Sequence, residues 1–191
     1  MKKLNIGFAL CGSFCTFSKV LKIMQELKEE GHNLFPIMSF NAYNTDTRFG
    51  KAENFIERIE SICSNKIIST LSEAEPIGPK KLLDILLIEP CTGNTLAKLA
   101  NSIADTPVTL AAKSQLRNMR PVVIAISTND ALSGAAKNIG LLQNYKNIYF
   151  VPYKQDNFAE KPTSIVADFS KTSETIKHAI NNTQLQPLIL N

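Results

Sequence analysis

The stretch that decides the fold is ILLIEPCTGNTLAKLA, residues 85–100. Its unbroken apolar run, residues 85–88, is typical of a strand that is buried on both faces in a parallel sheet. We expect Pro90 to end this strand, because proline cannot donate a hydrogen bond to a sheet ladder. A turn of small polar residues follows, and a helix is predicted over residues 95–103. The turn consists of Thr92, Gly93, Asn94 and Thr95.

A helix start of this kind presents free N–H groups and the positive end of the helix dipole, so the turn after residue 90 suits an anion. An ordinary helix cap is the alternative interpretation, since Thr and Asn are common capping residues. A second turn of the same type follows an apolar strand at residues 4–10 and precedes a helix at 16–30. There, Gly12 lets the backbone approach a ligand, and the Ser13 hydroxyl can donate to a phosphate.

A Rossmann dinucleotide site is disfavoured at the first turn. Such a site needs the pattern G-x-G-x-x-G and an acidic residue at the end of the second strand. The glycines here are only Gly7 and Gly12, and the second predicted strand ends at Asn41 without a carboxylate. The sequence therefore favours a mononucleotide with one phosphate.

Apolar strands alternate with helical segments along the 191 residues. Strands are predicted near 4–10, 34–39, 83–88, 121–126 and 148–151, and helices near 16–30, 51–62, 95–103, 107–117, 131–143 and 171–181. This alternation predicts one α/β domain over 1–191, a doubly wound parallel sheet with helices on both faces. The irregular segments 41–50 and 153–164 are predicted to be active-site or interface loops.

Composition excludes several classes of protein. The net charge of +4 comes from scattered lysines and arginines, which argues against nucleic acid as a partner. No apolar run approaches 20 residues, so no membrane segment is expected, and the short N-terminal apolar stretch does not fit a signal peptide. The four cysteines and two histidines form no metal-binding pattern. We therefore expect a cytoplasmic protein with no bound metal and with reduced cysteines that act as small apolar side chains.

The two turns also carry a family resemblance. Gly12-Ser13 after the first strand and residues 90–100, PCTGNTLAKLA, resemble the flavoprotein family of cysteine decarboxylases and flavin prenyltransferases. The resemblance implies that FMN is the cofactor. It places the FMN phosphate at Gly12, Ser13 and the turn formed by Thr92, Gly93, Asn94 and Thr95, with Ser39 nearby.

Two positions depart from the decarboxylases of that family. Their catalytic histidine, counted back from Asp84, is replaced by Pro76, which is followed by Ile77. Their substrate clamp, Pro-Ala-Met-Asn, reads Ile126-Ser127-Thr128-Asn129 here, and only the asparagine remains. Decarboxylation by the family mechanism is therefore disfavoured, although the flavin cradle is intact.

Three further segments resemble one branch of the family, found in spore-forming bacteria. They are Ser39-Phe40-Asn41 with residues 44–50, residues 127–132, and residues 184–187. The resemblance implies a homo-oligomer in the mother-cell cytoplasm. It would work with a second protein chain, which carries the NADP site, to oxidise a dihydropyridine dicarboxylate to its aromatic form. A non-catalytic scaffold that stabilises this second chain is the alternative, and so is a flavin-dependent decarboxylase or prenyltransferase.

A dicarboxylate substrate requires a fixed cation or several aligned donors. Arginine is the best partner for a carboxylate because its planar group can make two parallel hydrogen bonds. We predict that Arg48 and Asn129 bind the substrate carboxylates and that Ser127 and Thr128 assist. The alternatives are that Arg48 is a surface or interface residue and that Asn129 caps the next helix. No residue is assigned as the catalytic acid or base.

Overall fold

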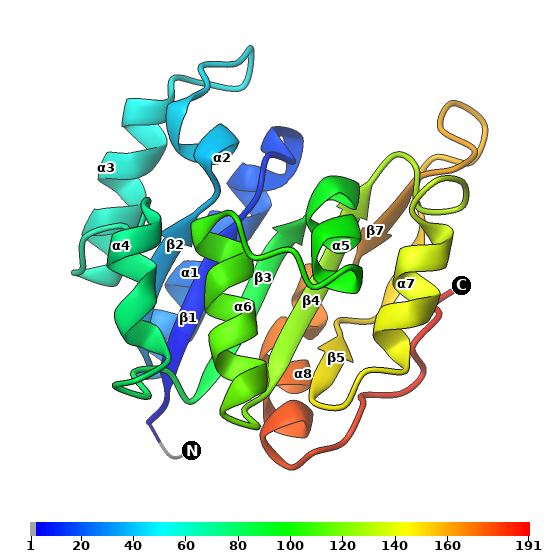
Figure 1. Cartoon of the computed structure of the whole chain (residues 1–191). Helices are drawn as coiled ribbons and strands as arrows, with labels where there is room; N and C mark the ends of the chain where they lie inside the picture. Colours follow the sequence, from blue (N-terminus) through cyan, green and yellow to red (C-terminus); the bar gives the residue numbers. More distant parts are fainter. Residues whose placement is uncertain (1–2) are drawn as a thin grey trace.

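The computed structural model describes residues 3–191, and the five predicted strands pair in parallel at the centre of its sheet (Figure 1). These strands are β1 (Asn5–Leu10), β2 (Asn33–Met38), β3 (Ile85–Cys91), β4 (Val122–Thr128) and β5 (Ile148–Phe150). They lie in the order β2-β1-β3-β4-β5. The order reverses between β1 and β3, and in open α/β sheets the carboxyl ends of the strands at such a point form a crevice.

Two short strands extend the sheet beyond the prediction. Strands β6 (Tyr153–Gln155) and β7 (Ile165–Ala167) pair antiparallel as a hairpin. The carboxyl end of β4 pairs with β7, so that Ser127 lies opposite Val166 and Thr128 opposite Ile165. The segment 153–164, predicted to be irregular, therefore begins with a strand. Strands of three residues are too short to show an alternating pattern in the sequence.

Helices cover both faces of the sheet, which confirms the doubly wound α/β fold. One face carries α1 (Phe17–Glu29), α3 (Ala52–Cys63) and α8 (Thr172–Ile180). The other carries α5 (Gly93–Ala100), α6 (Pro107–Arg117) and α7 (Ala136–Gln143), as Figure 1 shows. The shorter helices are α2 (Phe40–Asn44), α4 (Leu71–Ala74), η1 (Phe14–Thr16), η2 (Glu75–Ile77) and η3 (Phe169–Lys171).

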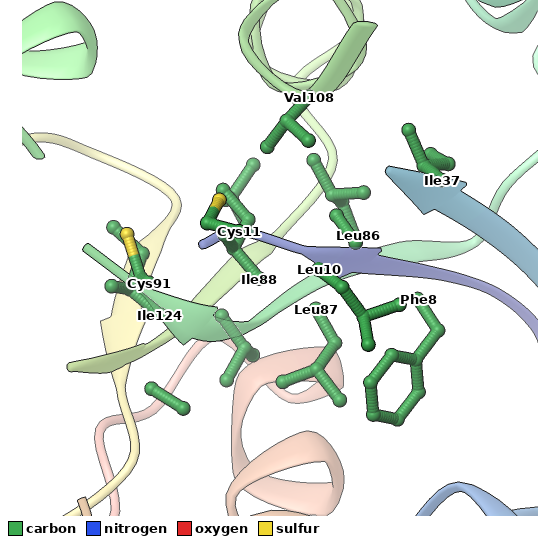
Figure 2. Close-up of a cluster of buried hydrophobic side chains, with 14 of the residues drawn as sticks. Phe8, Leu10, Cys11, Ile37, Leu86, Leu87, Ile88, Cys91, Val108 and Ile124 are labelled. Atoms are coloured by element: carbon green, nitrogen blue, oxygen red, sulfur yellow. The ribbon is translucent and has the colours of Figure 1, made fainter. Parts of the chain in front are cut away.

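Strand β3 is buried at every residue, as its apolar run predicts. Figure 2 shows this core, with Val108 of α6 on one side of the strands and Phe8 on the other. The expectation that Pro90 ends the strand is wrong, because β3 continues to Cys91. Its pairing with β4 shifts register between Ile88 and Cys91, where the proline has no N–H to donate. This irregularity carries the chain into the turn at residue 92.

Two predicted helices have different limits in the structure. The helix predicted at 95–103 is α5, which starts two residues earlier at Gly93 because the Thr92 side chain caps it. The helix predicted at 131–143 is shortened to α7, since residues 130–135 form turns instead. Ser133 and Ala135 both donate their N–H groups to the carbonyl of Asp130. Within residues 3–191, no helix has the length and apolar character needed to cross a membrane.

Candidate functional site

A cleft of about 580 Å³ opens at the carboxyl ends of β1, β3 and β4. Five segments that are distant in the sequence line it: the β1 turn with the start of α1, the loop before α3, the start of α5, the end of β4 and the β6–β7 hairpin. The lining residues are Gly12, Ser13, Phe14, Cys15, Thr16, Lys19, Arg48, Phe49, Thr92, Ser127, Thr128, Asn129, Asp156, Lys161, Ser164, Ile165 and Val166. The volume lies within the range of ligand pockets, about 300–1,000 Å³.

The β1 turn is held in place by short polar contacts. The Ser13 N–H donates to the carbonyl of Cys11 at 2.8 Å, and the Thr16 hydroxyl donates to the carbonyl of Ser13 at 2.8 Å. The Ser13 Oγ lies 2.9 Å from the Ser127 Oγ, at the end of β4. Two hydroxyl groups predicted for different ligand groups, the phosphate and a carboxylate, are therefore adjacent in the folded chain.

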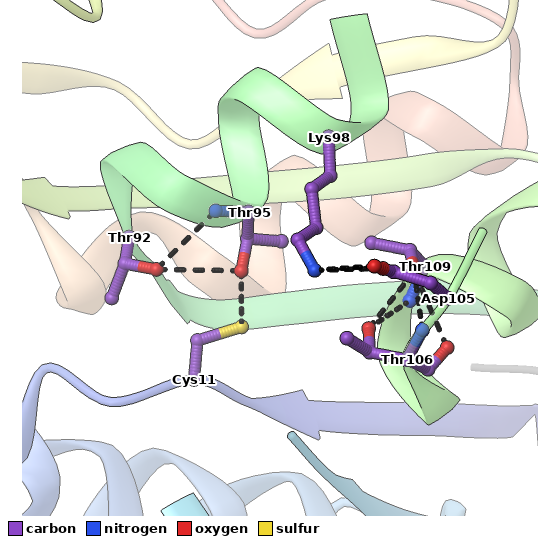
Figure 3. Close-up of polar contacts among 7 residues, drawn as sticks. All are labelled: Cys11, Thr92, Thr95, Lys98, Asp105, Thr106 and Thr109. Carbon is purple, nitrogen blue, oxygen red and sulfur yellow. Dashed lines mark hydrogen bonds and ion pairs between the residues drawn. The ribbon is translucent and has the colours of Figure 1, made fainter. Parts of the chain in front are cut away.

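The turn between β3 and α5 is organised by threonines, as Figure 3 shows. The Thr92 hydroxyl caps α5 by accepting from the N–H of Thr95, at 3.5 Å. The Thr95 hydroxyl donates in the opposite direction, to the Cys11 Sγ at 3.2 Å. Burial raises the pKa of the Cys11 thiol to about 11, so this sulfur is a neutral part of the core. Thr92 thus reaches the cleft, while Thr95 anchors the helix to β1.

Other residues of the predicted cradle lie beside the cleft lining. Gly93 packs against the β4–α7 turn, where an added Cβ would lie 2.5 Å from the Asp130 Oδ1 and 2.9 Å from the Thr128 Oγ1. A side chain at this position would therefore require the Asp130 and Thr128 side chains to shift. Asn94 is exposed in the first turn of α5, where the N–H groups of the first turn have no partner within the helix. The Ser39 hydroxyl caps α2 by accepting from the Ala42 N–H at 3.3 Å.

The end of β4 brings three polar residues into the cleft. The Thr128 hydroxyl donates to the Asp130 carboxylate at 2.6 Å. The Asn129 carbonyl accepts from the Thr163 hydroxyl at 2.6 Å, and its side-chain oxygen lies 3.5 Å from the Ser164 Oγ. The alternative in which Asn129 caps the next helix is not what the structure shows, because α7 begins only at Ala136.

Arg48 lies in an exposed loop on the opposite side of the cleft. Its guanidinium group is 4.9 Å from the centre of the Phe49 ring. A pair of hydrogen bonds between Thr47 and Gly50, each 3.0 Å long, closes the loop. No carboxylate in the described part of the chain forms an ion pair with Arg48. The side chain is therefore available to an anionic ligand.

Sequence reasoning missed much of the cleft wall, above all the hairpin residues Asp156, Lys161 and Ser164. The sequence does indicate this region, because the irregular segment 153–164 is predicted to be an active-site or interface loop. The sequence does not show that its charged residues face the end of β4. Lys161 forms an ion pair with Asp156 at 3.1 Å, and this pairing lowers the pKa of the Asp156 carboxyl.

Both histidines of the chain lie elsewhere. His32 is buried, and its Nδ1 accepts from the N–H of Leu4 at 3.2 Å. His178 is on α8. Pro76 and Ile77, at the positions of the decarboxylase His-Ile pair, belong to η2 and are not part of the cleft lining. Over residues 3–191, no group of three or more potential metal ligands is found.

The arrangement suits an anionic ligand. The cleft lining contains three cationic side chains, those of Lys19, Arg48 and Lys161, and a single carboxylate, that of Asp156. The hydroxyl groups of Ser13, Thr92 and Ser127 line the same cleft. Charged and hydroxyl donors at the carboxyl edge of a parallel sheet are well placed to bind phosphate or carboxylate groups.

The chain is similar to several known proteins. A family model described as Flavoprotein matches residues 1–182. The B subunit of dipicolinate synthase from Bacillus subtilis (strain 168) is 43% identical over 190 residues, which span 100% of this chain and 95% of that protein. The crystal structure of the dipicolinate synthase B subunit from Bacillus halodurans matches at a TM-score of 0.90 and 43% identity, over 98% of this chain and 96% of that one.

More distant solved structures share the fold. The FMN-dependent cysteine decarboxylase SpaF matches at a TM-score of 0.66 and 22% identity, over 92% of this chain and 97% of its own. At that level of identity the likeness concerns the architecture alone. The match of the family model to almost the whole chain, together with the full-length relatives, shows that this protein belongs to the flavoprotein family.

Proposed function

We propose that this chain is one of the two components of dipicolinate synthase, the one that binds FMN. It acts with the A subunit of that enzyme to oxidise dihydrodipicolinate, or its hydroxy-tetrahydro precursor, to dipicolinate during sporulation. The observation that carries the proposal is the meeting of Ser13, Thr92 and Ser127 in one cleft at the switch point of the sheet. The 43% identity to two proteins named as B subunits of dipicolinate synthase supports the choice of substrate.

The residues of the cleft fit FMN. Gly12 has no side chain to block the β1 turn, and the Ser13 and Thr92 hydroxyls lie at its mouth. The start of α5 adds the free N–H groups of Gly93 and Asn94, which favour a phosphate. We assign the phosphate to Gly12, Ser13 and the 92–95 turn, with Ser39 close by. The aromatic side chains of Phe14 and Phe49 also line the cleft and can pack on a flat ring.

Oxidation to an aromatic pyridine removes a hydride and a proton. A bound flavin supplies the hydride acceptor, which none of the amino-acid side chains provides. The chain's own task is to hold the two carboxylates of the substrate, and we assign this to Arg48 and Asn129 with help from Ser127 and Thr128. The sequence resemblance assigns an NADP site to the A subunit, so that electrons pass between the two proteins.

Two segments beside the cleft are candidates for contacts with another protein chain. The segments 41–50 and 153–164 border the cleft, and both carry exposed aromatic residues, Phe49 at 45% and Phe158 at 73%. We propose that these segments contact another copy of this chain or the A subunit, in the cytoplasm of the mother cell. A dodecameric structure among the distant fold relatives shows that this architecture is compatible with a large homo-oligomer.

The test begins with cofactor binding. We expect titration of the purified protein with FMN to change flavin fluorescence. We expect no binding when NADP is titrated into the same protein. A variant with a carboxylate in the phosphate position, Ser13→Asp, should lose FMN. Ser18→Asp is the matched control, since Ser18 is exposed on the first turn of α1 and is not part of the cleft lining. Binding of NADP but not FMN would overturn the assignment.

An activity assay then distinguishes the two hypotheses, in which this chain is either a catalytic component or a non-catalytic scaffold. The A subunit should be assayed by itself, with the wild-type chain, and with Ser13→Asp. We expect product formation to require both proteins and to be lost with the FMN-deficient variant. Full activity of the complex that contains Ser13→Asp would show that this chain only stabilises the A subunit.

A further inference from the structure

The β6–β7 hairpin places an ion pair inside the cleft. Asp156 follows β6, and Lys161 lies near the end of the same loop. Their side chains approach to 3.1 Å between the Lys161 Nζ and the Asp156 Oδ2. Both residues line the cleft, and the side chains of Lys161 and Asp156 are 50% and 34% exposed, respectively. The ion pair is therefore accessible to a ligand.

The loop is fixed to the end of β4. The Leu132 N–H donates to the carbonyl of Thr163 at 3.0 Å, and the Thr163 hydroxyl donates to the carbonyl of Asn129 at 2.6 Å. The Ser164 Oγ lies between the side-chain oxygens of Asn129 and Asp156, at 3.5 and 3.4 Å. The loop that carries Lys161 is thus held beside Asn129, one of the residues that we assign to the substrate.

The charge balance of the cleft singles out Asp156. Among the lining residues it is the single carboxylate, against three cations, Lys19, Arg48 and Lys161, and it forms an ion pair with Lys161. Its negative charge repels an anionic substrate, yet it also keeps the flexible lysine in one place. Lysine has three donors, so its ammonium group can bind a second carboxylate while it keeps the first.

We propose that Lys161 binds one carboxylate of the dicarboxylate substrate and that Asp156 is an internal counterion whose negative charge limits the affinity for that substrate. This inference rests on the proposed function, because it concerns the same cleft and the same substrate. It adds a specificity residue that the sequence pattern did not indicate.

The two partners should then have opposite effects on binding. Lys161→Met removes a charge-assisted hydrogen bond and should weaken dipicolinate binding by roughly tenfold or more. Asp156→Asn removes the repelling charge and should strengthen binding by roughly three- to tenfold. A purely structural ion pair predicts the same direction for both variants, because either change breaks the same contact.

The experiment is calorimetric titration of dipicolinate into wild type, Lys161→Met and Asp156→Asn, each with and without FMN. Lys154→Met is the matched control, since Lys154 is exposed on β6 and is not part of the cleft lining. Picolinate, which has one carboxylate, is the second probe, and its affinity should respond less to Lys161→Met than that of dipicolinate. Thermal unfolding should stay near wild type, because exposed ion pairs contribute little to stability.

Several results would overturn the inference. These are a change of the same sign in both variants, a loss of FMN affinity in Lys161→Met with unchanged dipicolinate affinity, or no binding of dipicolinate to the wild type. Failure of the FMN assignment is a separate outcome. In that case the wild type does not bind FMN, and the opposite effects on dipicolinate can still be measured in the cofactor-free protein.

Discussion

Replacing Glu89 by glutamine is expected to change how the stability of the protein depends on pH between about 5 and 8. Glu89 lies on β3, fully buried, with its Oε2 accepting a 2.6 Å hydrogen bond from the Thr172 hydroxyl of α8. Its other oxygen, Oε1, has no hydrogen-bond partner among residues 3–191. Burial raises the pKa of this carboxyl from 4.5 to about 8, and the Thr172 hydrogen bond offsets only part of the effect.

The direction follows from comparing the folded and unfolded chains. Below about pH 4.5 the Glu89 carboxyl is protonated in both states, so it does not change the free energy of unfolding. As the pH rises, the unfolded chain releases the proton while the folded chain keeps it, so the free energy of unfolding falls until the folded group also ionises near pH 8. The span from 4.5 to about 8 corresponds to roughly 5 kcal/mol, or about 1.4 kcal/mol per pH unit. That is a large part of a typical total of about 5–15 kcal/mol.

The assay is urea unfolding of wild type and Glu89→Gln at several pH values. Gln keeps an acceptor for Thr172 but places an unpaired amide in the core, which costs about 1–3 kcal/mol at any pH. We therefore expect the variant to be less stable than wild type near pH 5 and at least as stable near pH 8. Glu57→Gln, at an exposed position on α3, controls for the loss of one carboxylate. Parallel pH curves for wild type and Glu89→Gln would refute this account of Glu89.

Two further predictions concern the cleft and its frame. Arg48→Lys and Asn129→Ala should each lower turnover of the two-component enzyme by roughly 10- to 150-fold and leave FMN affinity unchanged. Steady-state kinetics measure the turnover, and flavin fluorescence measures the FMN affinity. Near-wild-type turnover would show that these residues do not bind the substrate. Gly93→Ala should destabilise the protein by about 0.5–1.5 kcal/mol in urea unfolding, because its Cβ would lie 2.5 Å from the Asp130 Oδ1 and the exposed Asp130 side chain must turn away and lose its hydrogen bond from Thr128; unchanged stability would show that the turn can shift at no cost.

Local patterns in the sequence were sufficient for the main architecture. The runs that became β1, β3 and β4 are strongly apolar, and the helices between them have apolar faces at helical spacing, so α/β alternation follows from the chain itself. The turns after β1 and β3 could also be identified, since glycine and short hydroxyl side chains act locally at helix starts. Both turns are expected at the same edge of the sheet, because parallel pairing places the carboxyl ends of the strands together.

Short and irregular elements could not be predicted from local sequence patterns. Strands β6 and β7 have three residues each, and β3 passes through Pro90 because a register shift accommodates it. The turns after Asp130, which shorten α7, depend on backbone hydrogen bonds to that residue and on the contact of Leu132 with Thr163. The strand pairings and the contact of Leu132 with Thr163 involve partners that are distant in the sequence, so a local pattern does not reveal them.

The sequence by itself determined the fold class, the family and the positions of the turns after β1 and β3, because each depends on neighbouring residues. Only the tertiary structure decided which side chains share the cleft. Ser13 and Ser127 are 114 positions apart yet 2.9 Å apart in space, and the hairpin adds Asp156 and Lys161 beside Asn129. It also decided that Glu89 is buried and that Gly93 lies against the Asp130 side chain. The physical reason is that contact, burial and charge balance are properties of packed surfaces, which exist only after distant segments have come together.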